Sequence, residues 1–121
     1  MYVRPFPDVD GGRWQVSRDG GSEPLWAHSG RELFFRSANG DLVAVTVRAG
    51  TSFEAGEQRV LFPASAYWSN PGHAQYDITP DDRRFVFIRP IGSEDPGAQS
   101  STVVLVQNWL RELEAGAARG R

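Results

Sequence analysis

The stretch from Trp26 to Phe35, WAHSGRELFF, decides the fold. A short strand at 24–26 precedes a tight turn at 28–30, and a second strand follows at 32–36. Apolar side chains alternate along the second strand, so Leu33 and Phe35 are expected on one face and Phe34 on the other. The pattern is typical of an antiparallel strand-turn-strand unit.

Two further strands extend this unit toward the C-terminus. Ala38-Asn39-Gly40-Asp41 contains Asn-Gly, the strongest short-range hairpin signal, and leads into a Val-rich strand at 42–47. A turn at 49–51 and an outer strand at 58–62 follow. The sequence therefore predicts a four-stranded antiparallel meander over residues 22–63.

The same unit recurs 52 residues later, where Ile78 to Phe87 reads ITPDDRRFVF. Apolar positions fall on apolar positions, turn falls on turn, and Arg31 falls on Arg83. Strands are expected at 75–79, 84–89 and 102–107, with Phe85 and Phe87 on one face and the last strand buried on both faces. A repeat at a fixed offset is typical of sheets arranged around an axis, as in a β-propeller. A β-sandwich accounts for the short strands but leaves the repeat unexplained.

The two ends of the chain are less regular. Strands are expected at 2–6 and 13–17, with Trp14 and Val16 on one face. Residues 92–101 are polar and rich in Gly and Pro, which predicts a mobile loop. Residues 109–118 form the one predicted helix, which Asn108 caps.

Composition excludes several classes of protein. The 121 residues suffice for one domain. The net charge of −2 gives no polybasic footprint for nucleic acid. All thirteen basic residues are Arg. The absence of Cys excludes disulfides, thiolate zinc sites and Cys nucleophiles. No apolar run approaches membrane length, and the first residues lack the layout of a signal peptide, so we expect no membrane partner and a cytoplasmic location by default.

The segment Trp26…Gly30-Arg31-Glu32-Leu33-Phe34-Phe35 resembles the W-S-P-D-G-R-x-L-x-F signature of TolB-type, WD-repeat-like propellers, and residues 78–83 resemble it again. Residues 2–7, 15–21 and 104–109 look like the C-terminal end of such propellers, which in bacteria often follow a Ser/Thr protein-kinase domain. The resemblance implies an all-β fold with roughly two four-stranded antiparallel blades and a short C-terminal helix. Residues 1–121 would be a partial β-propeller: outer strands of an incomplete blade at 2–21, a complete blade at 22–63, the last blade at 73–109 and the helix at 109–118.

Two departures from the family pattern matter. His28-Ser29 replaces Pro-Asp in the first turn, and Asp82 replaces Gly in the second, so both turns should be strained or differently typed. The strand count also leaves unpaired edges at both ends. Either three copies close a six-bladed ring, or the chain is a fragment of a longer protein.

No residue set carries a clear chemical signature. His28 and His73 are the only histidines, and although Asp77 and several Ser allow a Ser-His-Asp set on paper, no Gly-x-Ser-x-Gly elbow accompanies it. Asp8-x-Asp10-Gly11 lacks the remaining ligands of a calcium loop and is interpreted as a turn. Asp81-Asp82 beside Arg83-Arg84 is interpreted as a solvated turn. We therefore predict no catalytic residue, no metal, no cofactor and no enzymatic activity.

The non-repetitive segment Tyr67-Trp68-Ser69-Asn70-Pro71-Gly72, followed by His73, is the candidate binding loop. Its residues Tyr67, Trp68, Asn70 and His73 are the predicted contacts for a protein or peptide partner. The alternative is that Tyr67 and Trp68 close a hydrophobic gap between two sheets. The sequence thus favours a non-enzymatic interaction or scaffold module, as the C-terminal part of a sensor or kinase-linked protein or as a self-assembling homo-oligomeric ring. The rival hypothesis is an accessory propeller domain of an enzyme such as a serine peptidase.

Overall fold

The computed structural model describes residues 1–91 and 100–106, and for Ile91 and residues 100–106 it describes the backbone alone. This part of the chain is all-β: it holds nine strands in three antiparallel sheets and contains no helix. It also holds no helix long and apolar enough to cross a membrane. The predicted helix at 109–118, Gln107 and most of the predicted loop lie outside the described residues.

The central sheet has four strands in the order β3-β4-β5-β6. They are β3 (Ser22–Trp26), β4 (Glu32–Arg36), β5 (Asp41–Ala49) and β6 (Phe53–Pro63). This confirms the predicted meander and its turns. Strands β5 and β6 are both longer than expected, because bulges between Leu42 and Val43 and between Val45 and Val47 let their pairing continue past irregular positions.

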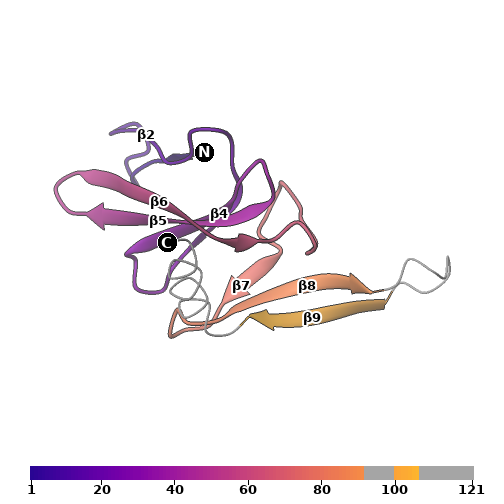
Figure 1. Cartoon of the computed structure of the whole chain (residues 1–121). Coiled ribbons are helices and arrows are strands. Elements are labelled where there is room, and N and C mark those ends of the chain that lie inside the picture. The colour runs from indigo at the N-terminus through magenta and orange to yellow at the C-terminus, as the bar shows by residue number, and fades with distance from the viewer. Residues whose placement is uncertain (92–99, 107–121) are drawn as a thin grey trace, which may run out of the picture.

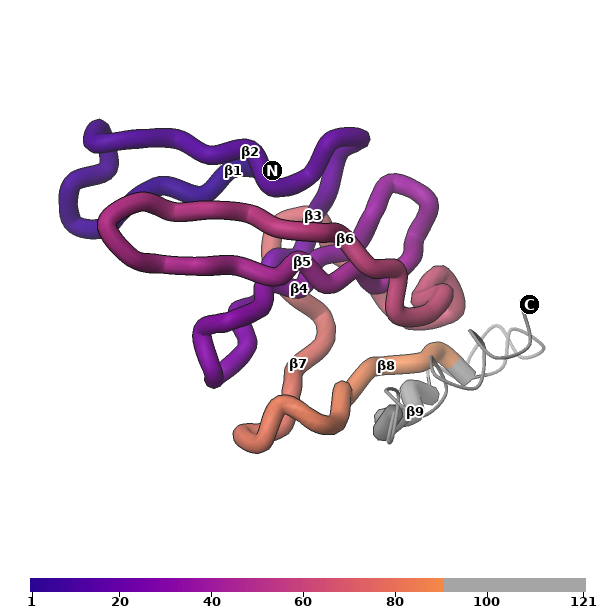
Figure 2. The backbone as a smooth tube through the Cα atoms, turned by 60° about the vertical axis from the view of Figure 1, so that its left-hand side comes forward, coloured from indigo at the N-terminus to yellow at the C-terminus, as the bar shows by residue number. Residues whose placement is uncertain are grey.

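A smaller sheet lies on each side of the central one, as Figures 1 and 2 show from two directions. The hairpin β1 (Tyr2–Val3) and β2 (Trp14–Gln15) covers one face, and β7 (Tyr76–Ile78), β8 (Phe85–Ile91) and β9 (Ser100–Val106) lie on the other. The strands β1 and β2 are shorter than predicted; Pro5 and Pro7 offer no N–H for a longer ladder. The loop prediction was wrong at Ser100 and Ser101, which pair with Ile91 and Pro90 in the β8–β9 ladder.

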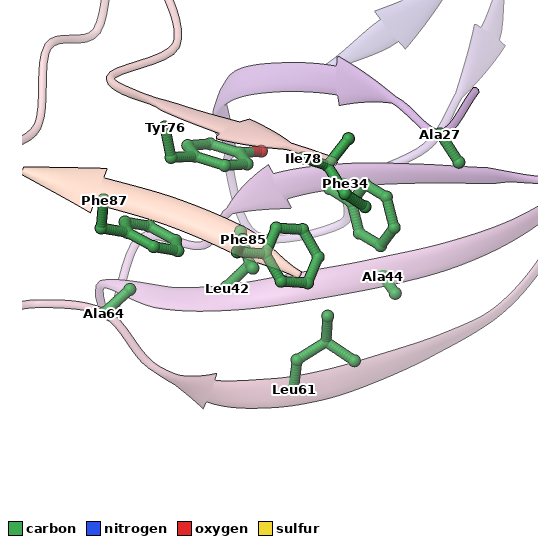
Figure 3. Close-up of a cluster of buried hydrophobic side chains, with 10 residues drawn as sticks. All are labelled: Ala27, Phe34, Leu42, Ala44, Leu61, Ala64, Tyr76, Ile78, Phe85 and Phe87. Carbon is green, nitrogen blue, oxygen red and sulfur yellow. The ribbon is translucent and has the colours of Figure 1, made fainter. Parts of the chain in front are cut away.

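Alternation along β4 divides the core into two clusters, as the sequence predicted. Phe34 joins a cluster that also receives Phe85 and Phe87 from β8. Figure 3 shows the Phe34 and Phe85 rings next to each other between the two sheets. The Phe34 and Phe85 rings meet edge to face with centroids 5.0 Å apart. Leu33 and Phe35 join the second cluster, which Val3 and other residues near the N-terminus cover. The central sheet is thus buried on both faces.

The 52-residue repeat is visible in the backbone. Trp26 pairs with Leu33 in β3–β4, and Ile78 pairs with Phe85 in β7–β8. The turns between these strands share one hydrogen-bond pattern: Gly30 N donates to Ala27 O at 3.0 Å, and Asp82 N donates to Thr79 O at 2.8 Å. Gly30 has a φ of 68° and Asp82 a φ of 57°. Asp82 is therefore a left-handed, non-glycine residue at the position that Gly30 holds in the first turn, and the two turns share one hydrogen-bond pattern.

Candidate functional site

The four predicted contact residues lie in the segment between β6 and β7, and the structure separates their roles. The centroids of the Tyr67 and Phe87 rings lie 4.7 Å apart, and Tyr67 packs against the core cluster of Figure 3. Tyr67 thus fills the structural role that the sequence left open as the alternative. The Trp68 side chain is 55% exposed, and His73 is exposed as well.

The main chain beside Trp68 is fixed to its surroundings. Trp68 N donates to Ile88 O at 2.8 Å, which ties the segment to β8. Asn70 Oδ1 accepts from Gly72 N at 2.8 Å and closes a local turn, so its side chain is engaged within the segment. Because backbone and turn are both held, Trp68 and His73 are the predicted residues left to meet a partner.

A buried ion pair holds the backbone of this segment in place. Arg36 Nε lies 2.8 Å from Glu23 Oε2, a contact of charges without hydrogen-bond alignment, and the two side chains are 4% and 0% exposed. Arg36 also donates through Nη1 to Tyr67 O at 3.3 Å and through Nη2 to Trp68 O at 2.9 Å. Glu23 Oε1 accepts from Asn70 N at 2.5 Å. The pair therefore binds both ends of the 67–70 backbone, and we call these two residues the Glu23–Arg36 latch.

The backbone of β3 is irregular at Glu23. The φ of Glu23 is 55°, and the β3–β4 register shifts between Ser22 and Leu25, so the ladder is interrupted where the Glu23 side chain is buried. Tyr76 Oη donates to Glu23 O at 2.9 Å and holds the distorted backbone. Burial raises the pKa of the Tyr76 hydroxyl well above its usual value, and the nearby Glu23 charge adds to the effect.

A second long-range contact joins the two copies of the repeat. Asp82 accepts hydrogen bonds from His28 N at 2.8 Å and Ser29 N at 2.9 Å, so the β7–β8 turn is tied to the β3–β4 turn. Desolvation opposes ionisation of Asp82, but the N–H donors of Ser29 and His28 outweigh it and hold the pKa of this carboxyl below its usual value. The interpretation as a solvated turn missed this role.

Neighbouring Asp81 bonds within its own turn. Asp81 Oδ1 accepts from Thr79 Oγ1 at 2.5 Å and from Arg83 N at 3.1 Å. The Thr79 hydrogen bond, followed by that of Arg83, lowers the pKa of this carboxyl. The solvated-turn interpretation thus describes Asp81 better than Asp82.

The histidines and acids do not assemble into a reactive set in the described ranges. His28 Nε2 lies 3.3 Å from the carbonyl of Ile78, and Asp77 Oδ1 accepts from the N–H of the same residue. Asp10 lies 3.8 Å from Arg4, in an exposed ion pair. Within residues 1–90, where side chains are described, no group of three or more His, Asp or Glu could hold a metal ion.

The site is thus an exposed aromatic residue on a backbone held by a buried charge pair. Neither member of the latch stood out in the sequence: Glu23 precedes Pro24 in an expected strand edge, where an acidic residue suggests exposure, and no motif contains it. The chain matches no protein-family model, no curated protein and no solved structure at a significant level.

Proposed function

We propose that this chain is a non-enzymatic β-propeller module that binds a protein or peptide partner through the exposed side of residues 67–73. One observation supports the proposal above others: Trp68 is 55% exposed on a backbone fixed by Ile88, Arg36 and Glu23. An exposed Trp is a frequent binding hot spot, and a backbone ordered in advance lowers the entropy lost on binding.

The propeller part of the proposal rests on the repeat and on the layers. Strand register and turn hydrogen bonds recur at an offset of 52 residues, and three sheets follow one another in space in chain order. This order fits successive blades, of which the middle one has four strands. Such a frame presents loops from rigid sheets, which is how β-propellers place recognition residues.

The binding proposal is tested with a random-sequence peptide display library selected on the whole chain. We expect Trp68→Ala to weaken binding of the selected peptides by about tenfold or more, because hot-spot aromatics carry about 2 kcal/mol. Its free energy of unfolding, measured in urea, should stay within about 0.5 kcal/mol of that of wild type, because the side chain is exposed. Val60→Ala is the matched control, since Val60 is 56% exposed on β6, outside the segment. Unchanged affinity of Trp68→Ala for every selected peptide would contradict the proposal.

Assembly and parent architecture are separate proposals. The outer sheets hold two and three strands in the described part of the chain, which supports three copies completing a six-bladed ring. Such a ring has three times the 13.4 kDa of one chain, and a solution mass of one chain rules it out. A position as the C-terminal part of a sensor or kinase-linked protein, or as an accessory domain of a serine peptidase, is tested by the sequence of the flanking gene.

A further inference from the structure

A second surface lies beside the N-terminal hairpin, away from the Trp68 segment in the sequence. A hollow of about 240 Å³ opens between β1 and the start of the central sheet, with a lining that includes Tyr2, Val3, Arg4, Pro24, Trp26 and Leu33. Its volume is below the range of roughly 300 to 1,000 Å³ typical of pockets for drug-sized ligands. It suits one or two side chains of a peptide.

The backbone beside this hollow has an open edge. In the described ranges β1 pairs with β2 alone, and Val16 N donates to Met1 O at 3.0 Å. Hydrogen-bonded and non-hydrogen-bonded pairs alternate in an antiparallel ladder, so Tyr2, opposite Gln15, directs its N–H and C=O away from β2. An edge of this kind can accept an added strand.

Aromatic side chains with fixed neighbours flank the edge. Tyr2 is 52% exposed and Trp26 is 47% exposed. The Trp26 ring meets the Phe53 ring edge to face at 6.4 Å, and the Arg13 guanidinium lies 4.6 Å from the centre of the Tyr2 ring. Both rings are therefore positioned before a ligand arrives and present apolar area to it.

The positive charge at the hollow favours an acidic ligand. Arg4 contributes a cation, and none of the described residues that line the hollow is acidic. The contacts of Arg4 with Val9 O at 3.2 Å and Asp10 at 3.8 Å both use Nη1, and the Asp10 side chain is 94% exposed, so this ion pair is weak. A guanidinium carries five N–H donors, which leaves Nη2 and Nε for a carboxylate from outside.

We propose that this surface binds an extended, acidic segment of a partner protein by strand addition to β1. Alternate residues of the segment place an apolar side chain over Trp26 and Pro24, and the intervening carboxylate meets Arg4. The backbone of the segment pairs with the N–H and C=O of Tyr2. The surface uses none of residues 67–73 and is independent of the binding loop proposed above.

The test uses the ¹⁵N-labelled whole chain and a six-residue peptide in which valine and aspartate alternate. The Trp26 indole and Tyr2 amide signals should shift saturably, while the Trp68 indole signal stays in place. A peptide with lysine in place of aspartate should bind about tenfold more weakly, and one with N-methylated backbone nitrogens should lose binding because it cannot pair with the edge.

Variants separate this surface from the loop. Trp26→Ala should weaken binding about tenfold or more, and Arg4→Gln, an exposed change that leaves the fold intact, about threefold. Trp68→Ala should bind the peptide as wild type does. Equal binding of the lysine peptide, shifts at Trp68 in place of Trp26, or unaltered affinity of Arg4→Gln would overturn the proposal. Concentration-dependent dimerisation that broadens the Tyr2 amide signal would overturn it in favour of a second copy as the occupant.

Discussion

Replacing Arg36 by Met removes the cation of the Glu23–Arg36 latch and keeps an unbranched apolar stem in its place. The Glu23 side chain is fully buried, and Arg36 is the partner of its Oε2 oxygen. Breaking a buried pair by removing one partner costs about 3–5 kcal/mol, because an uncompensated charge remains in the interior. Loss of the donors to Tyr67 O and Trp68 O acts in the same direction. We therefore expect Arg36→Met to cost about 3–5 kcal/mol, a large share of the roughly 5–15 kcal/mol that stabilises a domain.

The double variant Glu23→Gln/Arg36→Met makes the prediction sharper, because it should be more stable than Arg36→Met alone. Glu23→Gln removes the buried charge that Arg36→Met leaves without a partner, and the Gln side chain keeps an oxygen that can accept from Asn70 N. Replacing both members of a buried ion pair by uncharged residues often changes the stability little. The cycle of single and double variants should thus show a coupling energy within the 0.5–3 kcal/mol found for contacting residues.

Urea unfolding followed by Trp fluorescence measures these stabilities. The matched control is Arg48→Met, since Arg48 is exposed on β5, and it should change stability by less than about 0.5 kcal/mol. A loss below about 1 kcal/mol for Arg36→Met, or a double variant less stable than Arg36→Met, would refute the reasoning that the latch is a coupled, buried pair. The position of the Trp68 indole signal reports separately whether the 67–70 backbone has moved.

Two further predictions concern the other long-range contacts. Because the folded-state pKa of Asp82 lies below its ordinary value of 3.8, its charged hydrogen bonds stabilise the fold fully above that value and are lost as the pH falls through the folded-state pKa. Asn tolerates the same φ as Asp82 but has no carboxyl group to protonate, so the folded fraction of Asp82→Asn should depend less on pH below about pH 4 than that of wild type. Far-UV circular dichroism measures this fraction, and an acid-unfolding curve identical to that of wild type would contradict the tie between the turns. Tyr76→Phe should cost about 1–3 kcal/mol in urea unfolding, because it leaves the buried Glu23 O without its donor. The raised pKa of Tyr76 also predicts that wild-type stability falls as the pH rises above the ordinary tyrosine value of 10.0, and that Tyr76→Phe weakens this fall.

Local pattern predicted the strands well wherever neighbours in sequence determine them. The strand at 32–36 has the predicted bounds, and Phe34 lies on the opposite face from Leu33 and Phe35, because alternation of apolar residues sets both properties. The β3–β4 and β7–β8 hairpins are alike because the sequence contains the same pattern of turn and strand residues at both places. The arrangement of blades around an axis stays a prediction.

Residues 67–73 stay a predicted binding loop. The structure shows that Trp68 is exposed and that Tyr67 packs on Phe87, a difference that the sequence could not reveal. Two adjacent aromatic residues in a loop give the same signal in sequence. Their burial depends on the sheet that lies beneath them, which the loop itself does not encode.

The amino-acid sequence by itself determined the all-β class, the hairpins and the division of β4 between two cores, because these follow from side-chain period and turn chemistry over a few residues. Tertiary structure decided the contacts between distant segments. Glu23 meets Asn70 across 47 residues, and Asp82 meets His28 across 54. An acidic residue in a strand or turn looks solvated in sequence, and only the approach of another segment with N–H donors gives Glu23 a stable buried place and Asp82 its long-range partners.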